Sequence, residues 1–228
     1  MKKAFSVREY LRVKKKTLNF EGEWAEAFGQ PESTGVWFIW GASGSGKSNF
    51  VMQLCKELCK YGRVALNSLE EGVSLSIQQT IERNQMECVK NRLIILNKER
   101  MEDLSVRMSK PRSPQFYIID SFQYAQMSAK DYYNFVDAHP NKLIVFVSHV
   151  DGKQPDGRPA KKALFDADLK IWVEGYRAIS RGRFIVQRGI TLYGRRAPTP
   201  TGVSPIRTTP MLPSPTKRNN QPIKNYEI

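Results

Sequence analysis

The chain has 228 residues, and its 36 lysines and arginines outnumber 22 aspartates and glutamates, which gives a formal net charge of +14. This length suits one domain with a sizeable core and leaves no space for a second catalytic domain. The basic excess favours a polyanionic partner, nucleic acid first, or else serves solubility. Because no apolar run matches a signal peptide or a membrane span, and three cysteines suit a reducing compartment, we expect a cytoplasmic protein with no membrane contact.

The first 34 residues form a basic segment that includes Lys14, Lys15 and Lys16. Within it, the aromatic spacing of residues 24–28 predicts a short amphipathic helix. We therefore separate residues 1–34 from the domain that follows.

From residue 35 onward, apolar strand-like runs alternate with helical stretches. Strands are expected near 36–40, 63–68, 92–96, 115–120, 142–148 and 168–174, and helices near 47–60, 73–86 and 128–138. This alternation predicts an α/β domain, a three-layer sandwich whose mostly parallel central sheet is covered by helices on both faces.

A glycine-rich loop follows the first predicted strand. Its eight residues spell G-x-x-x-x-G-K-S: Gly41, Ala42, Ser43, Gly44, Ser45, Gly46, Lys47 and Ser48. Glycines let successive backbone N–H groups turn inward around a phosphate chain, and the next helix adds its positive end. Lys47 would reach the β- and γ-phosphates and Ser48 would bind Mg²⁺, so the strand–loop–helix context predicts a nucleotide site.

Two further predicted strands end in carboxylates. Asp120 closes the run 115–120 and is the expected second Mg²⁺ residue, although Asp-Ser after a strand is also a common turn or helix cap. Glu70 and Glu71 follow the strand 63–68, where ligands collect in open α/β sheets. We expect Glu70 to polarise the attacking water; the alternative is that both glutamates decorate the start of the next helix.

The end of the chain changes in composition. Residues 180–194 predict an edge hairpin with its turn near Arg188-Gly189. Residues 195–228 are rich in proline and basic, lack helical or strand periodicity, and are expected to be disordered.

In this order and spacing, the phosphate loop, Ser68-Leu69-Glu70, the strand ending in Asp120 and Ser148-His149-Val150 resemble the ATPase core shared by RecA, RadA and the DnaB-type replicative helicases. The resemblance covers residues 35–194. It implies a RecA-like P-loop fold, ATP and Mg²⁺ as cofactors, and ATP hydrolysis. Lacking a Cys-x-x-Cys pair and the larger relatives' extra domains, the chain is most similar to short phage or mobile-element recombination ATPases.

The resemblance also implies roles that the residues alone leave open. His149 would sense the γ-phosphate and pass its state to the segment 150–163, which corresponds to the family's mobile DNA-contacting loop; a strand-end histidine satisfied by a hydrogen bond is the simpler interpretation. The basic residues of that loop would contact DNA phosphates: Lys153, Arg158, Lys161 and Lys162.

In this family, ATP lies between neighbouring subunits of a ring or filament. Cations from the neighbour complete the site, and Arg181 with Arg183 resembles the paired-cation element, with Arg188 as a substitute. The implied function is an ATPase that acts on single-stranded DNA as a homo-oligomer, in recombination, annealing or replication. A small P-loop metabolite kinase and an ATP-dependent assembly or helicase-loading adaptor remain alternatives.

Overall fold

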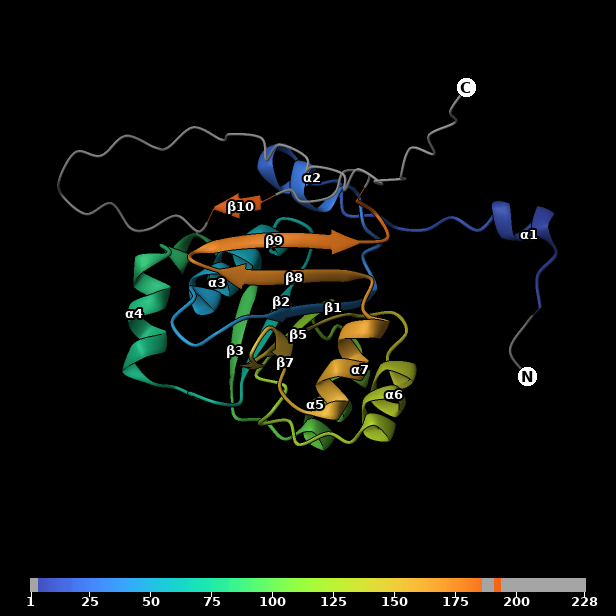
Figure 1. Cartoon of the computed structure of the whole chain (residues 1–228). Helices are drawn as coiled ribbons and strands as arrows, with labels where there is room; N and C mark the ends of the chain where they lie inside the picture. The colour runs from blue at the N-terminus through green and yellow to red at the C-terminus, as the bar shows by residue number, and fades with distance from the viewer. Residues whose placement is uncertain (1–3, 186–190, 194–228) are drawn as a thin grey trace, which may run out of the picture. The chain divides into compact units, whose positions relative to one another are not determined.

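The computed structural model describes residues 4–185 and 191–193, so Arg188-Gly189 and the tail 195–228 lie outside the described residues. Eight strands form the main sheet in the order β10-β9-β8-β1-β5-β4-β2-β3. Their bounds are β1 Gly35–Trp40, β2 Val64–Ser68, β3 Leu93–Asn97, β4 Phe116–Asp120, β5 Leu143–Ser148, β8 Leu169–Glu174, β9 Arg177–Gly182 and β10 Thr191–Tyr193. The six strands from β8 to β3 in that order are parallel, whereas β9 and β10 are antiparallel at the edge (Figure 1).

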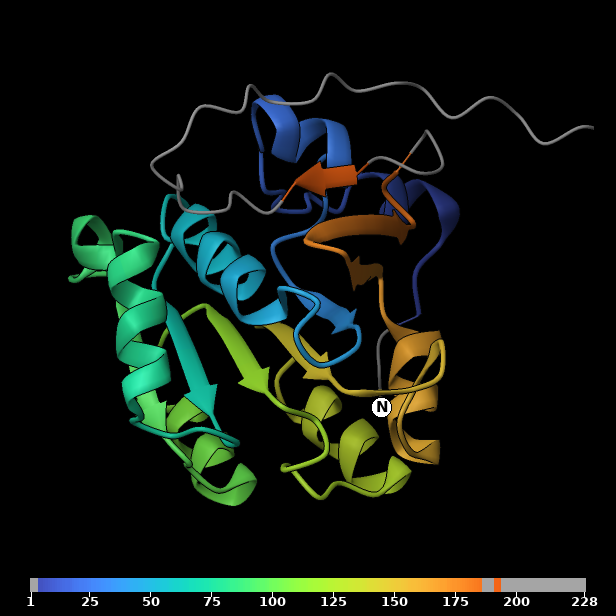
Figure 2. The same ribbon diagram turned by 60° about the vertical axis from the view of Figure 1, so that its left-hand side comes forward.

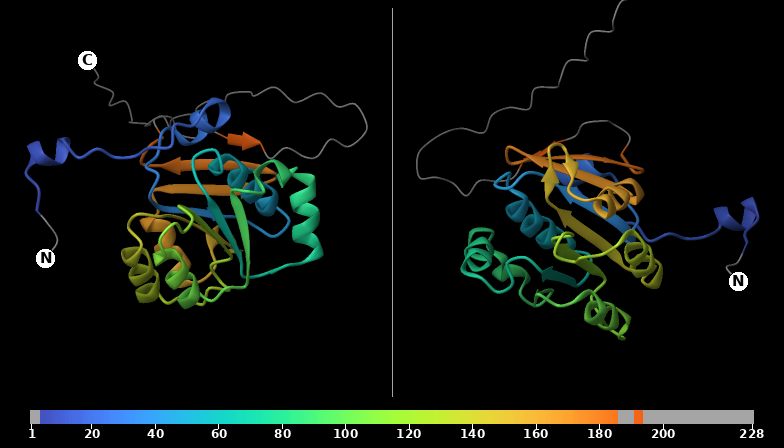
Figure 3. Two further views of the ribbon diagram at one scale, coloured as in Figure 1. Left: turned by 180° about the vertical axis from the view of Figure 1, so that it is seen from behind. Right: turned by 60° about the horizontal axis from the view of Figure 1, so that its bottom comes forward.

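The helices cover both faces of this sheet, so the three-layer prediction is confirmed. The covering helices are α2 Gly22–Phe28, α3 Lys47–Leu58, α4 Leu75–Arg83, α5 Met101–Ser109, α6 Ala129–Ala138 and α7 Arg158–Asp166, with a 3-10 turn at Met86–Val89. A further helix, α1 Val7–Leu11, buries no residue. Figure 2 shows α3 on one side of the strands, with α6 and α7 on the other side. Figure 3 shows α3 and α4 as neighbours.

Side-chain alternation along the strands divides the interior into two cores. Trp37 and Ile39 of β1 face the layer of α3, whereas Val36 and Phe38 face the layer of α5, α6 and α7. Because both faces of a parallel sheet are covered, its central strands β1, β4 and β5 are mainly apolar, as the sequence runs predicted. Every residue of β2 and of β5 is buried.

The N-terminal segment contributes to the first of these cores. Phe20 and Phe28 are buried, and each has its ring centroid within 6.3 Å of that of Trp37. Trp24 of α2 stacks on Phe50 of α3 with ring centroids 6.1 Å apart. The helix expected at residues 24–28 is therefore present, and it lies directly on the core.

The segment 150–163 differs from its prediction as a mobile loop. It forms a small hairpin of β6 Val150–Asp151 and β7 Gln154–Pro155, followed by α7. Gly157, with φ of 87°, turns the chain into the helix, Pro159 occupies its first turn, and Ala160 and Ala163 are buried against the sheet. The burial of this alanine face explains why a helix forms there, and proline in a first turn was the available sequence signal.

Candidate nucleotide site

The phosphate loop connects β1 to α3 at the carboxyl edge of the parallel strands. A Cβ at Gly41 would lie 2.2 Å from the Val173 carbonyl oxygen, so this position tolerates only glycine. Gly46 has φ of 100° and precedes the first residue of α3. The turn after β8 supports the loop from outside, because the Tyr176 N–H donates to the Ser45 carbonyl oxygen at 3.0 Å.

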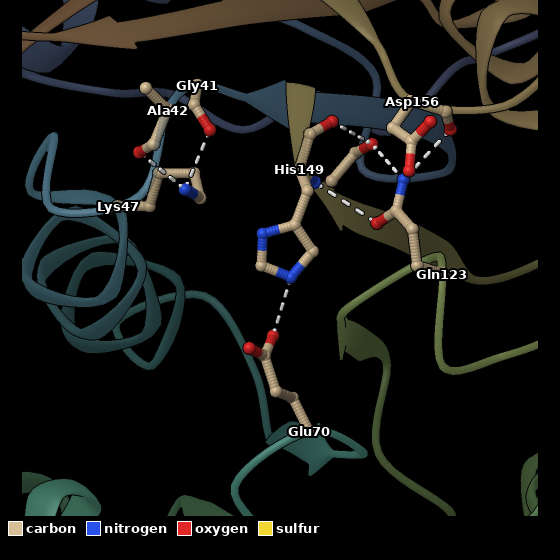
Figure 4. A network of polar contacts seen from close by, with 8 residues as sticks. Gly41, Ala42, Lys47, Glu70, Gln123, His149 and Asp156 are labelled. Carbon is tan, nitrogen blue, oxygen red and sulfur yellow. Dashed lines mark hydrogen bonds and ion pairs between the residues drawn. The ribbon is translucent and has the colours of Figure 1, made fainter. Parts of the chain in front are cut away.

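Lys47 lies across this loop. Its Nζ donates to the carbonyl oxygens of Gly41 at 2.7 Å and Ala42 at 2.8 Å (Figure 4). Burial lowers the pKa of Lys47, while Asp120 and Glu70 act in the opposite direction. An ammonium held by two carbonyls at the start of the loop can exchange them for phosphate oxygens without moving the main chain. The loop therefore fits the phosphates of a nucleotide.

Asp120 stands at the end of β4, opposite Ser68 of β2. Burial raises its pKa to about 6, and the neighbouring charges of Glu70 and Glu71 add to the effect. The backbone N–H groups of Leu69 and Glu70 both donate to the Asp120 carbonyl oxygen, which fixes the two strand ends together. Ser48 and Asp120 line the same cavity, and a hydroxyl with a carboxylate supplies the oxygen ligands that a divalent cation such as Mg²⁺ prefers.

The two glutamates after β2 have different partners. Glu71 accepts hydrogen bonds from the hydroxyls of Ser74 and Ser76 at the start of α4. Glu70 instead turns to His149, with 2.8 Å between Glu70 Oε2 and His149 Nε2 (Figure 4). Both glutamates line the cavity described below, but the helix-start interpretation describes Glu71, whereas Glu70 is paired with His149.

The predicted residues meet around one cavity of about 320 Å³. Lys47, Ser48, Glu70, Asp120 and His149 all line it. These residues come from the carboxyl ends of β1, β2, β4 and β5, the edge at which open parallel sheets bind ligands.

The same cavity has lining residues that sequence reasoning missed. They are Asn49 of α3, Ser76, Thr80 and Arg83 of α4, and Tyr176 after β8. Ser76, Thr80 and Arg83 are spaced so that they lie on one face of α4. The sequence shows this spacing, but it does not show that this face lines the cavity. Arg83 Nη1 donates to Asn49 Oδ1 at 3.3 Å, which places a cation of the same chain beside the phosphate loop.

The four predicted DNA-contacting residues lie elsewhere. Lys153 is in the turn of the β6–β7 hairpin, whereas Arg158, Lys161 and Lys162 belong to the first half of α7. All four are exposed. They are presented by a hairpin and a helix instead of the expected loop.

Arg181 and Arg183 are at the opposite edge of the sheet. Gly182, between them, pairs with Leu169, which in turn pairs with Trp37 in the first half of β1. Arg183 Nη1 lies 3.0 Å from Asp168 Oδ1, and Asp168 Oδ2 accepts from the Val36 N–H. The structure therefore does not bring this pair to the Lys47 site of the same chain.

Neither a protein-family model nor a curated protein sequence matches this chain. Solved structures do match its fold. One of them, an ATPase domain, aligns with a TM-score of 0.50 at 13% identity, over 70% of this chain and 80% of that domain. The flagellar accessory protein FlaH from Methanocaldococcus jannaschii aligns with a TM-score of 0.54 at 13% identity, over 79% of this chain and 95% of that protein.

At 13% identity, these two matches show a similar fold and nothing more.

Among the described residues, no helix is both long and apolar enough to cross a membrane. The site geometry and the two structural likenesses agree with the resemblance drawn from the motifs: the chain has the RecA-like fold of P-loop ATPase cores.

Proposed function

We propose that this protein binds ATP with Mg²⁺ and hydrolyses it, and that the bound nucleotide controls its hold on single-stranded DNA. The observation that carries the proposal is the single cavity around which Lys47, Ser48, Glu70, Asp120 and His149 meet. Such a set supplies a phosphate cradle, two metal-binding oxygens and a carboxylate beside a proton carrier.

The residues have separate tasks in this reaction. The loop N–H groups and Lys47 hold the phosphates and offset the negative charge that develops during transfer. Ser48 and Asp120 would hold Mg²⁺, and the bound cation would offset negative charge on the phosphates. The Glu70 carboxylate accepts a proton from the attacking water once its hydrogen bond to His149 Nε2 is broken.

Nucleic-acid binding is supported by charge and position. Lys153, Arg158, Lys161 and Lys162 are exposed on the segment that directly follows His149. Lysine and arginine contacts to phosphates bind a strand without reading its sequence. A role in recombination, annealing or replication agrees with this mode of binding.

The assembly and location form part of the same proposal. Arg181 and Arg183 sit far from the Lys47 site of their own chain, as cations that complete a neighbour's site would, so we propose a homo-oligomer. All three cysteines are free thiols, which suits the cytoplasm.

The experiment that tests the function is ATP turnover by the full chain, measured with no nucleic acid, with single-stranded DNA and with duplex DNA. We expect Mg²⁺-dependent turnover that single-stranded DNA stimulates most. Turnover that responds only to a small-molecule acceptor would identify a metabolite kinase, and tight ATP binding with no turnover in any arm would identify an assembly adaptor.

A further inference from the structure

The turn after β4 contains a residue with three hydrogen bonds to two different segments. Gln123 Nε2 donates to Ser148 Oγ at 2.9 Å and to the Asp156 carbonyl oxygen at 3.0 Å. Its Oε1 accepts from the His149 N–H at 3.1 Å. Figure 4 shows the Gln123 amide between the His149 main chain and Asp156.

The orientation of this amide follows from its partners. The His149 N–H can only donate and the Asp156 carbonyl can only accept, so the amide oxygen must face the first and its nitrogen the second. A side chain that replaces glutamine here must both accept and donate in the same geometry. An amide meets both requirements, whereas a carboxylate can accept but cannot donate.

The hairpin after His149 is fastened on the same side by a second set of contacts. The Asp156 N–H donates to the His149 carbonyl oxygen at 3.1 Å. Trp40, the residue before the phosphate loop, donates from Nε1 to the Lys153 carbonyl oxygen at 3.3 Å. The hairpin is thus linked both to the strand that carries His149 and to the strand that carries the phosphate loop.

These contacts form a continuous path from the cavity to the exposed basic residues of the β6–β7 hairpin and α7. At one end, the His149 ring is bonded to Glu70; at the other end, the hairpin leads into α7 with its exposed Lys161 and Lys162. Gln123 holds the His149 backbone between the two. A change at the Glu70–His149 pair that moves the His149 main chain can act on the hairpin through the Gln123 amide, which is the side-chain link beside the direct Asp156–His149 backbone hydrogen bond.

We propose that Gln123 is a positioning residue that ties His149 to the β6–β7 hairpin, so that nucleotide binding and nucleic-acid binding are energetically coupled. The inference rests on the proposed function, because it concerns the link between its two binding events. It predicts that breaking the amide bridge removes the coupling while each ligand still binds.

The test uses Gln123→Glu in the full chain. The carboxylate still accepts from the His149 N–H but cannot donate to Ser148 or Asp156, and it repels the Asp156 carbonyl. Gln126→Glu is the matched control, because it makes the same charge change in the same turn at an exposed residue with no part in the bridge. The readout is the affinity for a fluorescein-labelled oligothymidine, by anisotropy, with ADP and with a non-hydrolysable ATP analogue.

For the wild type and the control, we expect the two affinities to differ by at least about fivefold, the lower end of ordinary coupling between sites. In Gln123→Glu we expect the two affinities to become nearly equal, while binding of a fluorescent ATP analogue persists. A Gln123→Glu protein that keeps the wild-type ratio would overturn the inference and leave the proposed function standing. A wild type that binds nucleotide but shows no such ratio would overturn the inference as well, whereas a wild type that binds no nucleotide would remove the proposed function itself.

A second measurement needs no variant. Amide hydrogen exchange of the wild type, with and without the ATP analogue, reports on the Asp156 N–H within the hairpin. We expect nucleotide to change its protection along with that of His149. The inference would be overturned if the ATP analogue protected the phosphate loop but left hydrogen exchange in the hairpin unchanged.

Discussion

The two edges of the parallel sheet use the same kinds of side chain for different purposes. At the carboxyl edge, burial first and then the charges of Glu70 and Glu71 raise the pKa of Asp120 to about 6. At the amino edge, Asp168 accepts from the Val36 N–H at 3.2 Å and forms an ion pair with Arg183 at 3.0 Å. A satisfied carboxylate joins strands together, whereas a carboxylate crowded by like charges is prepared to receive a cation.

The largest expected effect is on turnover at the carboxyl edge. Glu70→Gln should retain ATP binding but lower the rate of hydrolysis by about 10²–10⁴-fold, because an amide cannot take a proton from water. Steady-state phosphate release measures this. Glu71→Gln is the control, since Glu71 binds Ser74 and Ser76; equal losses in both variants would contradict the assignment of the two roles.

The next effect concerns ATP affinity. Lys47→Ala removes the ammonium that lies across the loop, and we expect ATP binding in calorimetry to weaken by about 100-fold or more, equal to about 3 kcal/mol. Lys60→Ala, at an exposed lysine just past the end of the same helix, should bind ATP like the wild type. Unchanged affinity in Lys47→Ala would end the nucleotide hypothesis.

Substitutions at Asp120 and Asp168 should change the free energy of unfolding in opposite directions. Asp120 binds its proton more tightly in the folded state than at its ordinary pKa of 3.8, so its contribution to stability is lost as the pH rises from about 4 to about 6. Without Mg²⁺ at pH 7.5, Asp120→Asn should therefore raise the free energy of unfolding by about 1–3 kcal/mol, and the gain should disappear toward pH 4.

Asp168→Ala should instead lower the free energy of unfolding by about 1–2 kcal/mol, because it removes the Val36 and Arg183 contacts. Urea titrations at both pH values measure the two variants side by side. If Asp120→Asn and Asp168→Ala both lowered the free energy of unfolding at pH 7.5, the proposed difference between the two carboxylates would be wrong.

The smallest expected effect is on nucleic-acid affinity. Replacing Lys161 and Lys162 by alanine should weaken single-stranded DNA binding by a few-fold and make log Kd less steep in log salt by roughly one to two units. Lys60→Ala again serves as the control. Identical salt slopes for the wild type and the double variant would assign the strand to another surface.

The fold and part of the site could be predicted because they depend on local patterns. The glycine loop, the apolar strands and the carboxylates at their ends are all short-range signals, and the structure places them at one edge. The Glu70–His149 pair joins residues 79 positions apart, and the sequence indicated neither this contact nor the Gln123 bridge. Such contacts exist only once the strand order is set, which is why these polar networks escaped prediction.

The α7 helix was missed for a different reason. Two glycines before the helix, Gly152 and Gly157, and the place of the segment after His149 favoured a loop by family resemblance. This expectation outweighed the helix-forming run from Pro159 to Phe165. Local propensity was the better guide there, since Ala160 and Ala163 bury a helical face.

The aromatic cover formed by Phe20, Trp24 and Phe28 has a practical consequence for anyone who shortens this protein. A fragment that starts at residue 35, where the predicted strands begin, lacks the rings that pack on Trp37 and Phe50. It would expose these two aromatic side chains to water. Such a fragment should aggregate on expression even though it retains every residue that lines the candidate nucleotide site. Trimming that begins before Thr17 keeps these rings shielded and is the sensible starting point for crystals or assays.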